Sequence, residues 1–191
     1  MPRPSTKPST TPWRPTKEQI AAAVNTNVPD VIAPGLRLLF CGINPGLYSG
    51  AVGHHFARPG NRFWRVLHMA GITDRVLSPF EEAELLTRGV GITNFVERAT
   101  ATADKLSNDE LRAGARRLRA KLERFRPATV GFLGLTAYRT AFGIRDASVG
   151  PQPDELAGAD PWLLPNPSGL NAHYQPPELA RLFREAWLAS A

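Results

Sequence analysis

The chain has 191 residues, of which 42% are hydrophobic and 21% charged, and 23 Lys and Arg against 17 Asp and Glu give a formal net charge of +6. This length favours one domain over two large ones. The single cysteine excludes internal disulfides, four-cysteine zinc sites and iron–sulfur clusters, and no apolar run approaches the roughly 18–20 residues of a membrane-spanning helix. The positive charge is compatible with a polyanionic partner but does not by itself identify a site.

Residues 1–15 contain five prolines among Ser, Thr and Lys, without the apolar centre of an export signal. Because this composition cannot bury enough apolar surface to offset chain entropy, we predict a disordered basic tail over 1–15 and a single domain over 16–191. We also expect a cytoplasmic protein. A T-x-x-Q capping box at Thr16 predicts that the domain opens with a short helix.

Apolar runs and helix-capping signals predict strands that alternate with helices. The predicted strands span 36–42, 90–96, 128–133 and 162–164. The predicted helices span 61–70, 79–87, 108–125 and 135–142, with a last one from 176 to about 187. This order indicates the α/β class, as a three-layer α/β/α sandwich with a central, mainly parallel sheet of about four strands. We expect the site where the loops leave the carboxyl ends of these strands.

The first loop of interest, residues 42–46, reads Gly-Ile-Asn-Pro-Gly directly after the first strand. It lacks the lysine and the glycine spacing of nucleotide-binding loops. Pro45 restricts Asn44 to extended backbone values, and the glycines let a ligand approach the main chain. The alternative is an Asx-type turn at a strand end, with no function.

The second loop, residues 164–171, reads Leu-Pro-Asn-Pro-Ser-Gly-Leu-Asn after the last strand. Leu170 lies on a polar backbone stiffened by proline, where exposure of a leucine is unfavourable without an apolar partner. An apolar side chain on a stiff turn is what a protein needs to enter a DNA base stack and hold a nucleotide out of it. The alternative is that Leu170 folds back into the protein core.

Together and in this order, the two loops resemble those of the mismatch-specific uracil/thymine DNA glycosylases, the G/U mismatch-specific branch of the uracil-DNA glycosylase superfamily. Residues 53–56, 60–64 and 91–98 also look like segments of this family. The resemblance extends from residue 36 to the C-terminal helix. It implies a monofunctional, monomeric enzyme of base-excision repair that uses no cofactor and no metal. Such an enzyme flips uracil, and more weakly thymine or related damaged pyrimidines, out of mispairs with guanine in double-stranded DNA and hydrolyses the N-glycosidic bond.

The resemblance also implies roles for individual residues. Asn44 matches the asparagine that positions the attacking water, and an amide cannot act as a general base near neutral pH. The residues expected to bind the base are Ile43, Gly46, Ser49, Phe56 and Asn166. The residues expected to intercalate or to contact the opposite base are Ser168, Gly169, Leu170, Asn171 and Ala172. Some bacterial members have arginine at the position of Ala172. Alanine has no polar side chain, so we expect no side-chain contact to the opposite strand from this position.

Several charged residues have two interpretations. Glu97 or Asp74 could assist catalysis, but we favour an ion pair between Glu97 and Arg98 at the surface. We expect His54 and His55 to be hydrogen-bonding groups or phosphate neighbours and not metal ligands. Candidates for neutralising the DNA backbone are Arg58, Arg62 and Lys105, whereas the basic residues between 112 and 124 are expected to form a solvated helix face.

Two other function classes remain open. The chain could be a non-catalytic module that binds DNA mismatches or lesions, or a hydrolase of small molecules on the same sandwich. No lysine lies in either loop to form a Schiff base with the sugar, so a glycosylase of this sequence is expected to be monofunctional.

Overall fold

The structure, a computed structural model, describes residues 13–190. Most of the predicted tail, residues 1–12, lies outside this range. Trp13 is 50% exposed. The helix predicted at Thr16 is confirmed as α1 (Lys17–Ala22), and both hydrogen bonds of its capping box are formed.

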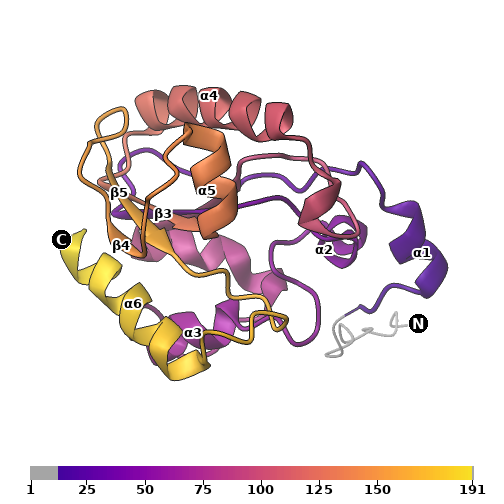
Figure 1. The fold of residues 1–191 in the computed structure, drawn as a ribbon. Helices are drawn as coiled ribbons and strands as arrows, with labels where there is room; N and C mark the ends of the chain where they lie inside the picture. The colour runs from indigo at the N-terminus through magenta and orange to yellow at the C-terminus, as the bar shows by residue number, and fades with distance from the viewer. Residues whose placement is uncertain (1–12, 191) are drawn as a thin grey trace, which may run out of the picture.

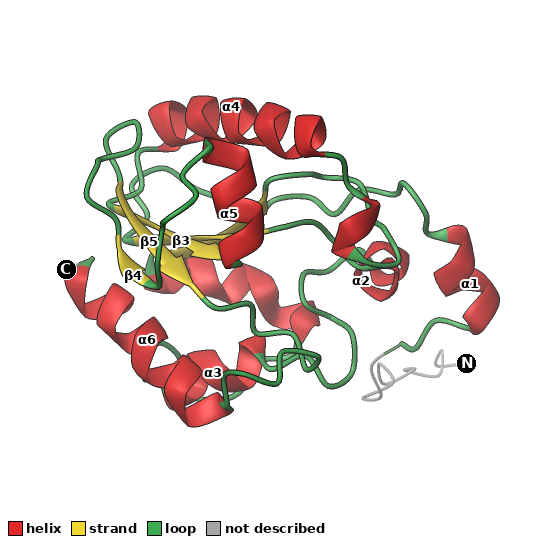
Figure 2. Cartoon of the chain, viewed as in Figure 1, coloured by secondary structure: helices red, strands yellow, loops and turns green. Residues whose placement is uncertain are grey.

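A five-stranded sheet forms the centre of the domain, which confirms the α/β class (Figures 1 and 2). Its strands, in chain order, are β1 (Leu38–Gly42), β2 (Val90–Asn94), β3 (Thr129–Leu133), β4 (Gly150–Pro151) and β5 (Asp160–Leu164). The spatial order is β2-β1-β3-β5-β4, and all neighbours are parallel except β4 and β5. Strand β4 was not predicted because two residues carry no periodic pattern, and its proline is tolerated because β4 is an edge strand.

Helices cover both faces of the sheet. Beyond α1, they are α2 (Leu47–Val52), α3 (Phe63–Met69), η1 (Pro79–Arg88), η2 (Ala103–Lys105), α4 (Asn108–Phe125), α5 (Leu135–Phe142) and α6 (Pro176–Ala189). Helices α4 and α5 lie together on one face, and α3 and α6 on the other (Figure 1). Each pair encloses its own apolar core against the sheet. None of the helices within residues 13–190 combines the length and apolarity needed to cross a membrane.

Three helical elements differ from the sequence-based expectation, and one of them, the short 3-10 helix η2, was not predicted at all. Residues 79–88 form a 3-10 helix although the capping box at Ser78 is present, because capping signals mark where a helix begins and not its pitch. Helix α2 was not predicted because its segment is rich in glycine. One of these glycines, Gly50, packs against Thr26 and Ala99, where an added Cβ would lie only 2.5 Å from Thr26 Oγ1 and 2.7 Å from Ala99 Cβ.

The pairing of β1 with β2 continues beyond the sheet and places the first loop. Gly42 is aligned with Asn94 at the end of the ladder. The N–H of Phe95 then donates to the carbonyl of Gly42 at 3.0 Å, and the N–H of Thr100 donates to the carbonyl of Pro45 at 3.1 Å. The predicted strand 90–96 therefore stops at Asn94, and the chain after it runs beside residues 42–46.

We predict that Gly114→Ala destabilises the protein by about 1–3 kcal/mol, although alanine normally stabilises the interior of a helix relative to glycine. Gly114 brings α4 against the carbonyl of Phe95, and an added Cβ would collide with that oxygen. Urea unfolding measures the change. Ala120→Gly, at an exposed position of α4, is the control and is expected to show only the propensity cost of about 1 kcal/mol. A more stable Gly114→Ala variant would refute this packing.

Candidate active site

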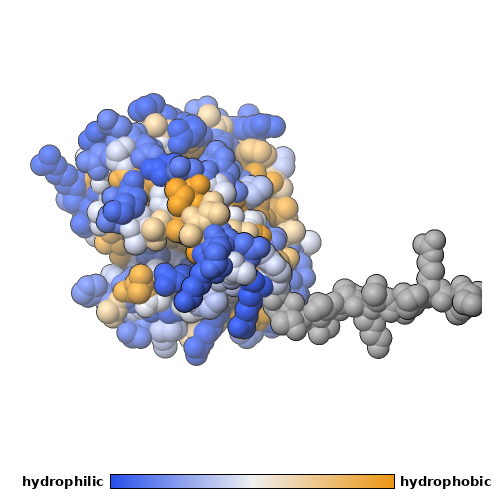
Figure 3. All heavy atoms as spheres, turned by 90° about the vertical axis from the view of Figure 1, so that its right-hand side faces the viewer, coloured by the Kyte–Doolittle hydropathy of each residue, from blue (hydrophilic) through white to orange (hydrophobic). Residues whose placement is uncertain are grey.

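A cavity of about 310 Å³ opens at the carboxyl end of the parallel strands. Its lining comes from the first loop, the second loop and the segments between them. The lining residues are Gly42 to Gly46, Ser49, His55, Phe56, Arg58, Asn61, Asn94, Thr100 to Ala103, Leu133, Asn166, Ser168 and Leu170. Figure 3 shows the molecule from this side, with apolar residues near the middle of the face and hydrophilic residues around them. A volume of this size is at the lower end of small-molecule sites and fits a single flat ring.

Most of the predicted site residues meet in this cavity. Those that line it are Ile43, Asn44, Gly46, Ser49, Phe56, Asn166, Ser168 and Leu170. Gly169, Asn171 and Ala172 are not among its lining residues and lie in the loop around Leu170. Three further lining residues, Asn61, Asn94 and Thr100, were not predicted, because their approach to the site depends on contacts between distant segments.

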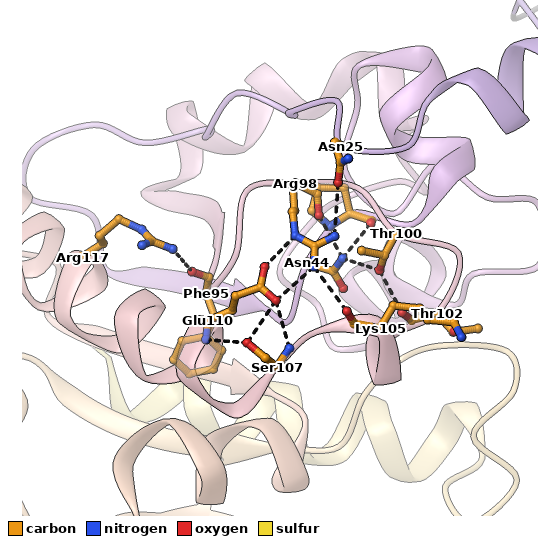
Figure 4. A network of polar contacts seen from close by, with 11 residues as sticks. Asn25, Asn44, Phe95, Arg98, Thr100, Thr102, Lys105, Ser107, Glu110 and Arg117 are labelled. Carbon is orange, nitrogen blue, oxygen red and sulfur yellow. Dashed lines mark hydrogen bonds and ion pairs between the residues drawn. The ribbon is translucent and has the colours of Figure 1, made fainter.

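The side-chain amide of Asn44 is held in one orientation (Figure 4). Its Nδ2 donates to the carbonyl of Arg98 at 3.0 Å, to the carbonyl of Pro45 at 3.2 Å and to Thr100 Oγ1 at 2.7 Å. Two of these acceptors are carbonyls, which can only accept, so the nitrogen and not the oxygen must face them. Among residues 13–190 no donor bonds to Oδ1 of Asn44, which leaves that oxygen available to accept a hydrogen bond from a molecule in the cavity.

A second layer of contacts holds the segment that orients Asn44. The hydroxyl of Thr100 donates a hydrogen bond to the carbonyl of Thr102 at 2.8 Å. The guanidinium of Arg98 bonds Glu110 at 2.6 and 3.0 Å, Asn25 Oδ1 at 3.2 Å and the carbonyl of Lys105 at 3.2 Å (Figure 4). The bonds from Arg98, with those from Ser107, lower the pKa of Glu110 to about 2. Arg98 thus joins the segment after β2 to the start of α4.

The cavity contains neither a carboxylate nor a lysine among the residues described. The two carboxylates considered from the sequence lie elsewhere in ion pairs. Glu97 pairs with Lys121 at 3.3 Å, and Asp74 pairs with Arg88 at 2.6 Å. The predicted pair of Glu97 with Arg98 is therefore wrong, because Arg98 is bound to Glu110. Lys121 departs from the predicted solvated face, since it is half-buried and also bonds Asp30 at 2.6 Å.

Phe56 forms a platform on one side of the cavity. Its ring stacks on Phe63 with centroids 4.1 Å apart and an interplanar angle of 26°. The backbone of Phe56 has a φ of 51°, a left-handed value that is strained for a residue with a side chain and is typical of functional sites. Ser49 Oγ accepts from the N–H of Ala57 at 3.1 Å and so helps to hold this turn. A Cβ at Gly42 would lie only 2.4 Å from Oδ1 of Asn94, so glycine makes room for the Asn94 side chain.

A buried carboxylate supports the turn that carries Phe56. Glu82 in η1 accepts from the N–H of His55 at 2.9 Å, and its two oxygens lie 2.7 Å from Nδ1 of His54 and 3.0 Å from Nδ1 of His55. Burial acts to raise the pKa of Glu82, but the hydrogen bonds from the two histidines outweigh it and hold the pKa below its usual value. The expectation that His54 and His55 are hydrogen-bonding groups is confirmed. Within residues 13–190, no three His, Cys, Asp or Glu side chains gather to hold a metal ion.

The segment between β5 and α6, residues 165–175, presents Leu170 to solvent, and we call it the wedge segment. Leu170 is 78% exposed, so the alternative that it folds into the core is wrong. Asn166 Oδ1 accepts from the N–H of Ser168 at 2.9 Å, and Asn171 Nδ2 donates to the carbonyl of Asn166 at 3.0 Å. Arg62, considered as a phosphate contact, instead donates to carbonyls of this segment. The wedge segment is therefore ordered by hydrogen bonds and not by apolar packing of Leu170.

Comparison with known proteins identifies the family. The family model described as "Uracil DNA glycosylase superfamily" matches residues 29–189. The chain belongs to this superfamily. Its fold is also similar to the solution NMR structure of a suggested uracil DNA glycosylase from Methanosarcina acetivorans, with a TM-score of 0.57 and 20% sequence identity, covering 85% of this chain and 98% of that chain. Enzymes of the uracil DNA glycosylase superfamily hydrolyse N-glycosidic bonds and act on DNA, so the cavity is the candidate active site of a DNA glycosylase.

We predict that Thr100→Val slows glycosidic bond cleavage by roughly tenfold to hundredfold, because Asn44 loses its shortest hydrogen bond and only the two carbonyl acceptors still hold its amide. Single-turnover kinetics measure the effect. Thr73→Val is the control, since Thr73 is also buried with its hydroxyl bonded to a carbonyl but lies outside the cavity. Equal rates for the two variants would contradict the proposed role of Thr100.

We predict that Glu82→Gln destabilises the protein at pH 7 by about 1–3 kcal/mol, and that the difference from wild type disappears in acid. The lowered pKa means that the folded state favours ionised Glu82. This stabilisation is present above the pKa of the unfolded chain and is lost as the pH falls through the lower pKa of the folded protein. Urea unfolding from pH 7 to pH 3 tests it, with exposed Glu84→Gln as the control. A difference that does not change with pH would contradict the assignment.

Proposed function

We propose that this DNA glycosylase removes uracil, and more weakly thymine or related damaged pyrimidines, from mispairs with guanine in double-stranded DNA. It acts as a monofunctional monomer without cofactor or metal and initiates base-excision repair. The observation that carries the proposal is the meeting of Asn44, Phe56 and Leu170 at one cavity. These three supply an acceptor for a water hydrogen, a flat apolar surface for a ring and an exposed apolar wedge.

The chemistry needs no general base in the cavity. The bond between the base nitrogen and C1′ of the sugar breaks, its electron pair leaves with the base, and the sugar becomes an oxocarbenium-like cation. Oδ1 of Asn44 accepts a hydrogen bond from a water and directs its oxygen to C1′, where the new bond forms. After attack, the water loses one proton to the surrounding solvent. Orientation of the water and stabilisation of the departing anion are the protein's contributions.

Asn166 is placed to stabilise the departing base. Its Oδ1 is occupied by the N–H of Ser168, so Nδ2 is the part of the amide left to donate. Gly42, which is buried, and Ile43, which is partly buried, line the same cavity where the chain leaves β1. A donor of this kind becomes more favourable as negative charge develops on the base.

Mispairs suit a site of this composition. Without a carboxylate in the cavity, the enzyme relies on extrusion of bases that are already weakly paired, since unstacking such bases costs less. Ser49 lines the cavity, where its hydroxyl would discriminate against a 5-methyl group by only about 1–3 kcal/mol. This supports a preference for uracil with weaker activity on thymine. Ala172 is exposed and has no polar side chain for the opposite strand.

The test uses duplexes that carry one G·U, G·T, A·U or fully paired site. We expect alkali-labile sites, fastest with G·U. Asn44→Ala is expected to lower the rate by about 10²–10⁴-fold with DNA binding retained. Leu170→Ala is expected to weaken both extrusion and cleavage. Leu188→Ala is the matched control, because Leu188 is also an exposed leucine, at 59%, and lies on α6.

Two outcomes would replace the proposal. Tight binding of mispairs by wild type without any cleavage would indicate the non-catalytic binding module. Turnover of free nucleosides that is unaffected by Leu170→Ala would indicate a small-molecule hydrolase.

A further inference from the structure

Arg62 makes an unusual set of contacts at the start of α3. Its Nη1 donates to the carbonyl of Tyr174 at 2.7 Å, and its Nη2 donates to the carbonyls of Ser168 at 2.5 Å and Asn171 at 3.0 Å. Its Nε and its main-chain N–H both donate to the carbonyl of Pro167, at 3.3 and 3.1 Å. Four of the five N–H groups of this guanidinium are therefore directed at one segment of the chain.

The acceptors lie on both sides of Leu170 in the wedge segment. All of them are main-chain carbonyls, and Arg62 forms no ion pair with a carboxylate among residues 13–190. The guanidinium of Arg62 could bind a DNA phosphate in a glycosylase. Here it is half-buried and bonds to main-chain carbonyls of the protein instead. Charged donors make stronger hydrogen bonds than neutral ones, so these contacts dominate the order of a segment that lacks apolar packing at its tip.

The neighbours of Arg62 in sequence belong to the other half of the site. Asn61 lines the cavity, and Phe63 stacks beneath the Phe56 platform. Gly60 is in contact with the wedge segment as well, since a Cβ on Gly169 would lie 2.7 Å from the carbonyl of Gly60. Residues 60–63 thus connect the Phe56 platform, where a flipped base would stack, with the wedge segment, whose Leu170 would fill the place of that base in the DNA.

We propose that Arg62 is a positioning residue that holds the wedge segment in its DNA-inserting shape before DNA is bound, and that it sets the distance between Leu170 and the Phe56 platform. The inference rests on the proposed function. It assigns Arg62 to base extrusion and not to the chemical step or to phosphate binding. The geometry of the fork matters as well as the charge, because the carbonyls surround the planar group at separate positions.

The test compares Arg62→Lys and Arg62→Gln with Arg65→Gln. Arg65 lies on the same helix, is exposed, and forms no hydrogen bond or ion pair with residues 13–190, so its variant removes a charge without touching the wedge segment. Extrusion is followed by the fluorescence of 2-aminopurine placed next to the uracil in a G·U duplex. Cleavage is followed under single-turnover conditions, and urea unfolding verifies that each variant is folded.

Both Arg62 variants are expected to slow extrusion by about 10²-fold, with Arg65→Gln unchanged. In a Leu170→Ala background, Arg62→Gln should cost little more, because both residues act in the same step and their effects are not additive. The salt dependence of binding should stay the same. If Arg62 contacts phosphate instead, Arg62→Gln lowers the slope of log K against log salt by about 0.9 and Arg62→Lys restores it, which would overturn the proposal.

Hydrogen exchange of the amides in the wedge segment gives a readout that does not depend on activity. Faster exchange in Arg62→Gln and Arg62→Lys, but not in Arg65→Gln, supports the inference even if wild type cleaves none of the duplexes, in which case only the proposed function fails. Unchanged exchange and unchanged extrusion in an enzyme that cleaves G·U would overturn the role of Arg62 and leave the proposed function standing.

Discussion

The parallel pairing of β1 with β2 is the constraint on which the site depends. Because Gly42 and Asn94 end their strands side by side, the chain beyond each strand stays hydrogen-bonded to the other, up to Pro45 and Thr100. Asn44 lies within this paired region, so its amide nitrogen meets acceptors supplied by the opposite segment. A different register would remove the acceptors of Arg98 and Thr100 and leave the amide less firmly held.

Three separate segments of the chain contribute to the site, and each supplies a different side chain. The segment after β1 carries Asn44, the turn at Phe56 supplies a flat wall, and the wedge segment carries Leu170. Each is supported by its own charged groups, which are Arg98 with Glu110, Glu82 with His54 and His55, and Arg62. These charged groups stabilise the scaffold, and among the residues described Arg58 is the one Arg, Lys, Asp or Glu that lines the cavity.

Local patterns were enough to predict the fold class and both loops. The capping boxes at Thr16, Ser78 and Ser107 are all formed, since each depends on residues only three positions apart. The site beyond the loops could not be predicted in the same way. Asn44 and Thr100 are 56 positions apart, and Arg62 is more than 100 positions from its acceptors. Such contacts follow from the order of strands in the sheet and from the path of α3, which no local spacing encodes. Family resemblance located the residues that would touch DNA but not those that hold them.

The exposure of Leu170 has a thermodynamic consequence for the proposed function. An apolar side chain in water is unfavourable, and a flexible segment would relieve this by folding Leu170 against the domain. The hydrogen bonds of the wedge segment oppose that movement, so in the proposed function the order of the segment is established when the protein folds and not when it meets DNA. Association then loses less conformational freedom, and more of the contact energy remains to unstack a base. In the proposed function, the site has no carboxylate to accelerate the chemical step. Its rate therefore depends on how often a weakly paired base is held in the cavity, and the smaller loss of conformational entropy on binding raises that fraction.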